Sequence, residues 1–321
     1  MEVRFVTLAE IQLVCDLPNY TSFADASFYL PYSPSLITKY VNHVEEELGI
    51  QIFVRSNRSK YLELTPEGNM VIESFKRLID EYSYLKKQIQ QLKNENSTLL
   101  KIGSQPRYGN IHEQAIISNF LFEKPALQLS IKKEAADELI RHLISGKIDA
   151  AFITFHDSLP LDSYFGERHS KLDVTYLLSE KEMYVGISDQ YFPNRTEICL
   201  KELEDFTFAF PFPNANDYQS ARATDSWISI AKEKGMHLNY MNLQGYDDTV
   251  FQLATVRKIA VTTSHIPTSQ PTGIHFLRIS DWTGCTNLYF LTLKNQSSRM
   301  VKDLKHCVLN YRTVYKRTNN L

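Results

Sequence analysis

The sequence has no long apolar run, and this absence excludes a membrane-spanning protein. Hydrophobic residues make up 43% of the 321 positions, but no stretch reaches the roughly 18 uncharged apolar residues that a spanning helix needs. The first 20 residues carry Glu2, Arg4, Glu10 and Asp16, rather than the basic and then apolar profile of a secretion signal. We therefore expect a cytoplasmic protein that does not enter a membrane.

Cysteine and glycine are both scarce. The four cysteines, Cys15, Cys199, Cys285 and Cys307, lie far apart with no C-x-x-C pair and no nearby histidine pair. Neither a disulfide framework nor a zinc site is predicted from them, and we expect reduced, mostly buried thiols. The 11 glycines include no glycine-rich phosphate loop and no G-x-S-x-G elbow, which argues against nucleotide-binding and hydrolase enzymes.

Other polar residues also give no reason to expect an enzyme or a metal centre. His156 and Asp157 would be half of a catalytic pair, but a His-Asp step after a strand is usually a loop or a ligand contact. Asp247 and Asp248 stand at a helix start, where acidic residues stabilise the helix dipole. Four histidines have no metal-ligand spacing: His169, His237, His265 and His275. No catalytic residue, cofactor or metal ligand is therefore predicted.

The chain also lacks an excess of positive charge. Lys and Arg number 35 against 37 Asp and Glu, a net charge of -2, and acidic residues outnumber basic ones within residues 1–65 as well. Bulk charge therefore does not indicate nucleic-acid binding. Any such contact must depend on where a few cations are placed.

Residues 34–48 are predicted to form a helix with one apolar and one small polar face. Ser33 and Pro34 are a typical helix start, and Gly49 is a typical stop. Apolar residues at helical spacing form the inner stripe: Leu36, Ile37, Tyr40, Val41, Val44 and Leu48. The opposite face carries Ser35, Thr38, Lys39, Asn42 and His43. Short polar side chains near a helix start suit phosphate and base-edge contacts in a DNA major groove, although a solvated face is the alternative.

A second short helix precedes this one. Ser22 is expected to cap "SFADASFYL", with Asp25 as its capping-box partner, and the turn "PYS" leads into the next helix. Two short helices joined in this way form a helix-turn-helix, whose second helix reads DNA. Ser22 and Ser33, at the two helix starts, are therefore expected DNA contacts too. Upstream, helical spacing predicts a supporting helix with an inner face of Phe5, Leu8, Ile11 and Cys15.

A hairpin, or wing, is predicted after Gly49. Apolar residues alternate over 50–54, and residues 61–64 return as a second short strand. The tip carries Arg55, Arg58 and Lys60, which could cross a DNA backbone or enter a minor groove. Considered alone this tip could be a solvated loop, but beside a helix-turn-helix it favours DNA binding.

The stretch from Ser22 to Gly68 resembles the winged helix-turn-helix of the LysR-type transcriptional regulators. The resemblance rests on these features: Ser-Phe at 22–23, Ala26, Leu30, Thr38, the run 45–49, Phe-x-Arg at 53–55 and Leu-Thr-x-x-Gly at 64–68. Pro34 stands where the family usually has glutamine, Ser35 where it has proline, and Ser27 where it has a second alanine. The missing glutamine removes a common base contact.

A long helix is predicted from Thr65 and Pro66. Its apolar residues are spaced alternately by four and three, with Asn96 as a polar member: Val71, Phe75, Leu78, Tyr82, Leu85, Ile89, Leu92 and Leu99. This heptad row is typical of a coiled coil, although a helix packed on its own domain is the alternative. At ~1.5 Å per residue the helix would be about 45 Å long. The resemblance implies that it pairs two subunits, giving a homodimer through residues 66–98 and a homotetramer.

From residue 99 onward, strand-like runs alternate with amphipathic helices, which predicts a two-lobed α/β domain with largely parallel sheets. The strand candidates are LLKIGS, LQLSIKK, DAAFITF, EMYVGIS, FAFPFP, KIAVTTS, IHFLRIS and NLYFLTL. The helices are expected near 111–123, 134–146, 217–234, 247–256 and 297–315.

Ligands in such folds bind beyond the carboxyl ends of strands. We therefore expect Ser104, Gln105, Thr154 and His156 to line a cleft, with Thr262 from a later strand. "LLKIGS" and "LIRHLISGKIDAAFIT" resemble the family's effector-binding domain, whose fold is similar to the periplasmic binding proteins. The resemblance implies a small effector held by hydroxyl groups after the first strand. "VRKIA" replaces the family's Gly-x-Gly-Ile-Ala.

Three parts are thus predicted: a winged helix-turn-helix over 1–65, a dimerisation helix over 66–98, and an effector domain over 99–321. The lobes of the last part would be 99–178 with 272–315, and 179–271. The sequence favours a sequence-specific transcriptional regulator whose partners are double-stranded DNA, a small-molecule effector and further copies of itself. The alternatives are a helix-turn-helix protein controlled by protein partners without a small ligand, and an α/β enzyme.

Overall fold

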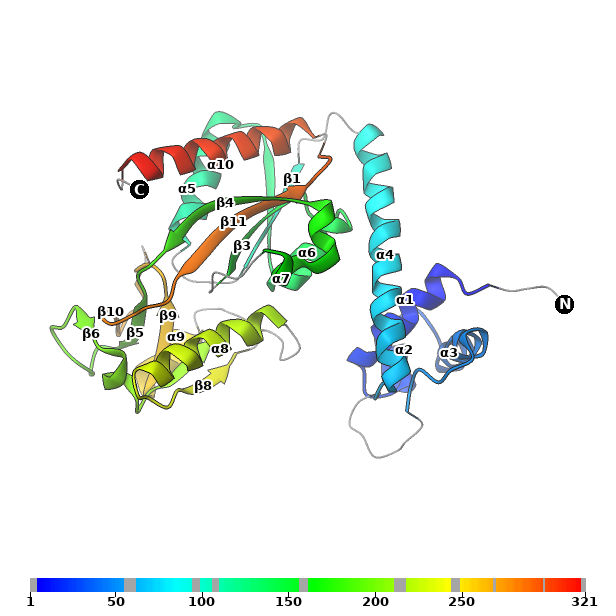
Figure 1. The fold of residues 1–321 in the computed structure, drawn as a ribbon, viewed down its shortest axis with the longest axis horizontal. Helices are drawn as coiled ribbons and strands as arrows, with labels where there is room; N and C mark the ends of the chain where they lie inside the picture. Colours follow the sequence, from blue (N-terminus) through cyan, green and yellow to red (C-terminus); the bar gives the residue numbers. More distant parts are fainter. Residues whose placement is uncertain are drawn as a thin grey trace. The chain divides into compact units, whose positions relative to one another are not determined.

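The computed structural model describes residues 5–54, 62–93, 99–105, 110–155, 161–210, 218–243, 249–267, 270–296 and 298–318 (Figure 1). The chain divides into two compact units, residues 1–88 and 89–321. Among the helices within the described ranges, none combines the length and the apolar character that crossing a membrane requires.

The first unit is a small helical domain, as the sequence predicts. Its helices are α1 (Leu8–Asp16), η1 (Leu17–Asn19), α2 (Phe23–Tyr29), α3 (Pro34–Leu48) and the first turns of α4 (Pro66–Lys93). One apolar core joins them, and its members on α1, α2, α3 and α4 include Val14, Ala26, Val41 and Phe75. The predicted helix-turn-helix is therefore confirmed.

The inner face of α1 differs from the prediction. The helix begins at Leu8 after the capping residue Thr7, so Phe5 precedes it and is 73% exposed. Leu8, in the first turn, is 41% exposed. The helix instead buries Leu13 and Val14 beside the predicted Ile11 and Cys15.

The base of the wing is present, and the Leu-Thr-x-x-Gly motif joins it to α4. Phe53 and Leu64 form an antiparallel bridge. The Thr65 amide donates to the Ile52 carbonyl at 2.9 Å, and the Thr65 hydroxyl accepts from the Gly68 amide at 2.8 Å. A side chain at Gly68 would place its Cβ 2.2 Å from the Ile52 oxygen, so only glycine allows this close approach. Arg55, Arg58 and Lys60 lie outside the described residues.

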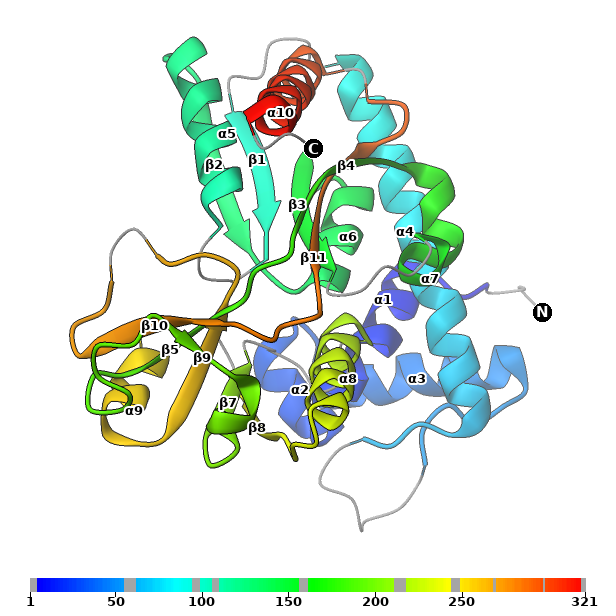
Figure 2. The same ribbon diagram turned by 60° about the vertical axis from the view of Figure 1, so that its left-hand side comes forward.

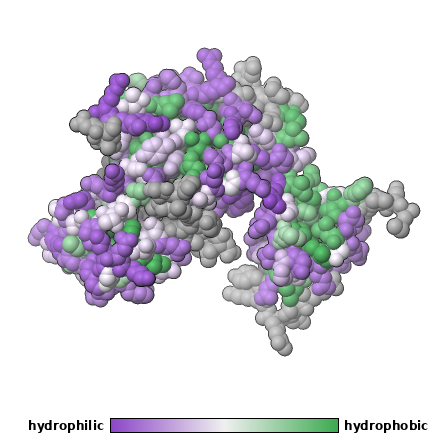
Figure 3. Space-filling view, viewed as in Figure 1, coloured by the Kyte–Doolittle hydropathy of each residue, from purple (hydrophilic) through white to green (hydrophobic). Residues whose placement is uncertain are grey.

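The heptad row of α4 has two parts. Val71 and Phe75 lie in the core of the first unit. Further along the helix, four apolar side chains are 44% to 53% exposed in the single chain: Leu78, Tyr82, Leu85 and Ile89. Figure 3 shows hydrophobic surface on the first unit, which includes most of α4. Asn96 lies outside the described residues, and Leu99 begins a strand instead of continuing the helix.

The second unit contains two sheets, and the first has the order β2-β1-β3-β11-β4. Its strands are β1 (Leu99–Ser104), β2 (Gln128–Lys133), β3 (Ala150–Phe155), β4 (Leu172–Glu180) and β11 (Thr286–Leu293). β1, β2 and β3 run parallel, whereas β11 is antiparallel to both neighbours. Helices α5 (Ile111–Glu123) and α10 (Arg299–Thr318) cover one face, and α6 (Ala136–Ile144) covers the other (Figures 1 and 2).

Successive residues of β1 show why both faces are covered. Ile102 packs into the core shared with α5 and α10. The next residue, Gly103, faces α6 so closely that an added Cβ would lie 2.6 Å from the side chains of Leu139 and Ile148. The short α7 (Leu161–Phe165) and η2 (Gly166–Lys171) lead into β4.

The second sheet has the order β6-β10-β5-β9-β7-β8. Its strands are β5 (Tyr184–Ser188), β6 (Glu197–Ile198), β7 (Thr207–Phe210), β8 (Asn239–Asn242), β9 (Ile259–Thr263) and β10 (Ile274–Ile279). The remaining elements of this part are η3 (Leu200–Leu203), α8 (Tyr218–Glu233) and α9 (Thr249–Val256). Trp227 of α8 packs against Phe208, Phe210 and Trp282 in the core.

Within the described residues the predicted strands and helices of this unit are confirmed, whereas one lobe boundary and the expectation of largely parallel sheets are wrong. Positions 211–213, 217, 247–248 and 297 of those predictions lie outside the described residues. β10 pairs antiparallel with β5, so residues 274–279 belong to the second sheet and not to the first lobe. The chain therefore returns from the second sheet to the first between Ile279 and Thr286. Both sheets are mixed rather than largely parallel. β4, which was not among the predicted strands, is a full strand of nine residues.

Candidate functional site

The amino-terminal half of α3 presents a polar surface. The Ser33 hydroxyl caps the helix by accepting from the Leu36 amide at 3.3 Å, and Gly49 ends it in the left-handed conformation with φ of 66°. Ile37, Val41 and Val44 face the core. The four side chains exposed on the other face include the only Lys of the helix: Ser33, Ser35, Thr38 and Lys39. The structure therefore brings the predicted recognition residues of the first two turns onto one face.

The hydroxyl groups on this face already make local hydrogen bonds. Thr38 Oγ1 donates to the Pro34 carbonyl at 2.9 Å, and the Ser33 and Ser35 hydroxyl oxygens lie 3.1 Å apart. A hydroxyl group has one donor and two acceptor positions. Thr38 therefore keeps its acceptor positions for a donor from outside the protein.

Asn42 and His43, further along α3, are only partly exposed. His43 Nδ1 lies 2.9 Å from Glu10 Oε1 of α1, and the Thr7 amide and hydroxyl each donate to Glu10 Oε2 at 2.8 Å. Burial raises the pKa of Glu10, but the hydrogen bonds from Thr7 and His43 outweigh it and lower that pKa below 4.5. His43 thus fixes α3 against α1, and its contact with DNA stays a prediction.

Ser22 caps α2 as expected, since its hydroxyl accepts from the Asp25 amide at 3.0 Å. In a capping box the Asp25 carboxylate would accept from the amide of Ser22 itself. Here it accepts instead from the amide and the hydroxyl of the preceding residue, Thr21, at 2.9 Å each. Ser22 is half-buried, and its DNA contact also stays a prediction.

Glu45 has a structural role that the sequence did not predict. It belongs to an acidic run at the end of α3, yet it is 8% exposed, and its Oε1 accepts from the Ile52 amide at 2.7 Å and the Phe53 amide at 3.2 Å. The carboxylate therefore holds the first strand of the wing against the recognition helix. Glu46 and Glu47 are exposed, so composition gives no signal that separates the three.

In the second unit, the ends of β1 and β3 form a small pocket with the first turn of α5. Thr154 Oγ1 donates to Gln105 Oε1 at 2.8 Å, and Ser104 Oγ donates to Glu113 Oε2 at 2.8 Å. The residues that line the pocket are Gln105, Asn110, Glu113, Phe152, Thr154 and Leu288. The predicted Ser104, Gln105 and Thr154 are thus brought together at the carboxyl edge of the sheet.

Two residues of the pocket, Asn110 and Glu113, were not predicted from the sequence. They are buried and lie at the start of α5, the helix that follows the first strand. Helix starts after parallel strands meet the carboxyl edge of the sheet, and this rule could have suggested them. Thr262 lies in β9 of the second sheet, where it pairs with Val185 of β5, and it does not line this pocket. His156 lies outside the described residues.

Family models match both units of the chain. A model described as LysR substrate binding domain matches residues 93–310, and one described as bacterial regulatory helix-turn-helix protein, lysR family, matches residues 8–69. HTH-type transcriptional regulator YtlI of Bacillus subtilis is 28% identical over 158 residues, which are 49% of this chain and 50% of that protein. HTH-type transcriptional regulator DsdC of Escherichia coli is 35% identical over 114 residues, 35% of each chain. This chain therefore spans half or less of the length of these relatives.

Solved structures show the same fold along nearly the whole chain. Full-length CbnR complexed with its target DNA has a TM-score of 0.53 at 16% identity, covering 95% of this chain and 99% of that one. HinK, a LysR family transcriptional regulator from Pseudomonas aeruginosa, has a TM-score of 0.51 at 17% identity, covering 96% and 99%. At these identities the likeness concerns the fold.

Proposed function

Because the chain belongs to the LysR family, we propose that it is a DNA-binding transcriptional regulator whose activity responds to a small molecule bound in its second unit. The observation that carries the proposal is α3, a capped helix with small polar side chains and one cation exposed on its first two turns. Such a helix fits a major groove, where short side chains reach phosphates and base edges.

Sequence preference would depend on few side chains. Pro34 occupies the position of the glutamine that is common in the family, and proline offers no side-chain hydrogen bond. Ser35, Thr38 and Asn42 would therefore read bases, while Lys39 would contact a phosphate. Arg55, Arg58 and Lys60 of the wing would add phosphate contacts that act equally on any DNA sequence.

Pairing of two chains would place two copies of α3 on one duplex. The exposed apolar row of α4 supports a homodimer through residues 66–98, since a row of this kind at heptad spacing is the seam of a coiled coil. Further contacts between dimers would give the homotetramer that the sequence led us to expect. As a DNA-binding regulator, the chain would work in the cytoplasm.

The pocket between β1, β3 and α5 is the proposed effector site. Phe152 and Leu288 supply apolar wall, and Gln105, Asn110 and Thr154 supply polar groups. Glu113 is a buried carboxylate, which accepts but does not donate hydrogen bonds when ionised. The pocket therefore favours a small polar effector that carries an amine or another strong donor. The proposal assigns binding and no catalytic step to the chain, and control by a protein partner without a small ligand is the second candidate.

The DNA proposal is tested by comparing two variants on two duplexes, one from the chain's own upstream region and one scrambled. Thr38→Val should weaken binding to the first duplex by roughly 10-fold and leave the scrambled duplex unchanged, because it removes a base-reading group. Arg58→Ala should weaken binding to both duplexes. It should also reduce the slope of log binding constant against log salt concentration by about one, because one phosphate contact is lost. Fluorescence anisotropy at several salt concentrations measures both effects.

Glu47→Gln is the matched control, since Glu47 is exposed at the far end of α3. It should leave the preference between the two duplexes unchanged. Equal losses for Thr38→Val on both duplexes would contradict base reading. A wild-type chain that binds neither duplex would contradict the proposed function itself.

A further inference from the structure

Three side chains from distant parts of the sequence converge where the two sheets of the second unit are joined. His112 lies in the first turn of α5, Glu180 is the last residue of β4, and His265 follows β9. His265 Nε2 lies 3.1 Å from His112 Nε2 and 2.9 Å from Glu180 Oε1, and His112 Nε2 lies 3.4 Å from the same Oε1. Three atoms with lone pairs therefore form a nearly equilateral triangle.

Protons alone do not satisfy this triangle when Glu180 is ionised. Each ring nitrogen carries either one proton or one lone pair, and the carboxylate only accepts. If both nitrogens are protonated, two donors lie 3.1 Å apart with no acceptor between them, and if neither is, two lone pairs oppose each other. If only one nitrogen is protonated, the other presents its lone pair to the carboxylate. Every arrangement leaves at least one of the three contacts unfavourable, whereas a cation between the atoms would satisfy all three.

The dimensions of the triangle match a transition-metal site. Zinc binds imidazole nitrogen at about 2.0–2.1 Å and carboxylate oxygen at about 2.0–2.2 Å in a tetrahedral arrangement, which separates neighbouring ligand atoms by roughly 3.3 Å. We propose that His112, Glu180 and His265 form a binding site for a divalent transition metal, with Zn²⁺ the best fit. Two imidazoles and one carboxylate are also acceptable ligands for Ni²⁺, Co²⁺ and Cu²⁺.

The surroundings of His112 support its role as a ligand. Its second ring nitrogen, Nδ1, lies 2.8 Å from the Tyr311 hydroxyl of α10. A metal-binding histidine commonly fixes its ring by a hydrogen bond from the other nitrogen, and here Nδ1 would donate to the Tyr311 oxygen while Nε2 faces the metal. The Tyr315 ring packs edge-on against the His112 ring, with centroids 5.0 Å apart. Tyr311 is thus a positioning residue for the site.

Burial leaves the site open on one side. The His112 side chain is 3% exposed and that of Glu180 is 2% exposed, whereas that of His265 is 26% exposed. A metal would therefore have three protein ligands and a fourth position that solvent or a small molecule can occupy. The backbone near His265 is fixed by Thr263, whose hydroxyl donates to the His265 carbonyl at 2.8 Å.

The metal would join the two lobes. His112 lies in α5, which packs on the first sheet, Glu180 ends strand β4 of that sheet, and His265 follows a strand of the second. One bound ion would therefore hold the carboxyl end of β9 against β4 and α5, and would stabilise one angle between the lobes. Metal binding goes beyond the proposed function and does not depend on it, because it can be measured without DNA.

The test uses the full-length chain, stripped with a chelator and dialysed against buffered Zn²⁺. Plasma mass spectrometry should find about one zinc per wild-type chain, and none above background in His265→Gln or Glu180→Gln. Zinc should raise the melting temperature of the wild type and leave both variants unchanged, because only a folded site binds the metal. X-ray absorption should show nitrogen and oxygen donors without sulfur.

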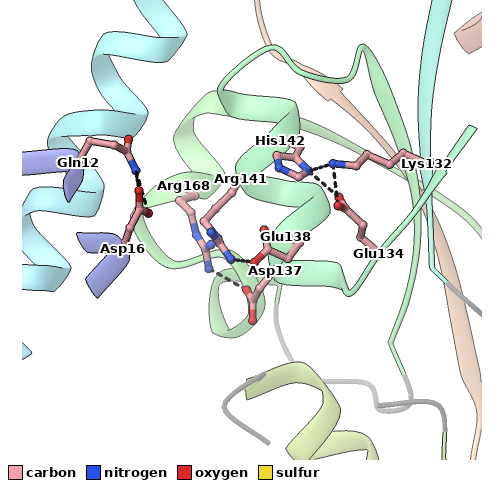
Figure 4. Close-up of polar contacts among 9 residues, drawn as sticks. All are labelled: Gln12, Asp16, Lys132, Glu134, Asp137, Glu138, Arg141, His142 and Arg168. Atoms are coloured by element: carbon pink, nitrogen blue, oxygen red, sulfur yellow. Dashed lines mark hydrogen bonds and ion pairs between the residues drawn. The ribbon is translucent and has the colours of Figure 1, made fainter. Parts of the chain in front are cut away.

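The matched control is His142→Gln. Figure 4 shows His142 beside Glu134 and Lys132, with His142 Nδ1 2.5 Å from Glu134 Oε2. This is a histidine and carboxylate pair of the same domain with no second histidine in the contact, so the variant should keep its zinc. Tyr311→Phe should bind zinc at least ~10-fold more weakly while it keeps the one-to-one stoichiometry.

The proposal would be overturned if the wild type holds no more zinc than His265→Gln, or if X-ray absorption shows sulfur ligands. Circular dichroism of the metal-free variants identifies any that fail to fold. Because His265 is partly exposed and Glu180→Gln keeps its shape, at least one folded variant is expected. Loss of zinc with normal DNA binding would leave the proposed function intact, and loss of DNA binding with normal zinc would leave the metal site intact.

Discussion

Glu10 and Glu45 are carboxylates that the fold of the first unit buries and uses. Glu10 joins α1 to α3 through His43, and Glu45 joins α3 to the wing through two backbone amides. Hydrogen bonds to charged groups contribute about 1.5–3 kcal/mol, more than neutral ones. The position of the recognition helix therefore depends on single side chains that do not touch DNA.

Glu10→Gln should destabilise the first unit by about 1–3 kcal/mol at neutral pH. The pKa of Glu10 is lowered below its ordinary 4.5 in the folded chain, so its stabilising effect is complete above pH 4.5 and is lost as the pH falls through the lowered value. The difference between wild type and variant should therefore shrink as the pH falls below 4.5 and the folded carboxylate becomes protonated.

Hydrogen exchange of α1 and α3 peptides is the measurement for this variant, because both tryptophans, Trp227 and Trp282, lie in the second unit and do not report on the first. Glu47→Gln, at an exposed position of α3, should exchange like the wild type throughout the same pH range. A Glu10→Gln difference that stays constant throughout an acid titration below pH 4.5 would contradict the role of the ionised carboxylate.

Among elements, the start of α4 is the most constrained by backbone packing. Gly68→Ala should lower the free energy of unfolding of the first unit by about 1–3 kcal/mol, because the new methyl group would collide with the Ile52 carbonyl. Hydrogen exchange over residues 50–75 measures the loss. Met70→Ala, two residues later and 64% exposed, should have little effect. Equal protection of residues 50–75 in Gly68→Ala and Met70→Ala would show that the wing shifts to admit the methyl group without losing stability.

The exposed row of α4 predicts how chains associate. Leu85→Glu should weaken self-association by roughly 100-fold or more, because it places a charge in an apolar seam in both copies. Arg77→Glu changes the charge of the same helix outside the row and should leave association unchanged. Analytical ultracentrifugation measures the self-association of both variants. A Leu85→Glu chain that remains dimeric would show that the dimer interface lies elsewhere.

At the scale of the whole molecule, the pocket and the proposed metal site share the start of α5, where Asn110 and Glu113 line the pocket and His112 lies between them in the sequence. The chemistry of Glu113 predicts which effectors bind. In a thermal-shift panel of small amines, amino acids and carboxylic acids, compounds with an amine should raise the melting temperature and simple acids should not.

Glu113→Gln should reduce that preference, since it removes the negative charge and keeps the shape of the side chain. Glu123→Gln, at the other end of α5, is the control and should respond like the wild type. Stabilisation by acids alone would contradict the assignment of Glu113 as the group that recognises the effector. A chain that no compound stabilises would favour control by a protein partner.

Local patterns in the sequence determined most of the elements of this protein. Capping residues and helical spacing placed α2, α3 and the start of α4, and alternating apolar runs placed eight strands of the second unit, because these features depend on residues a few positions apart. The same spacing identified the exposed row on α4. Phe5 and Leu99 are exceptions, since Phe5 precedes the cap at Thr7 and Leu99 begins a strand although both follow the helical spacing.

Tertiary structure alone decided which distant residues meet. β10 could pair in either sheet, and only its hydrogen bonds to β5 place it in the second. Glu45 resembles Glu46 and Glu47 until the wing strand brings its amides to it. His265 lies 153 residues from His112 and 85 from Glu180, too far apart for any spacing rule to connect them. Such contacts depend on the path of the whole chain, because a hydrogen bond or a metal ligand set requires atoms within a few ångströms regardless of sequence distance.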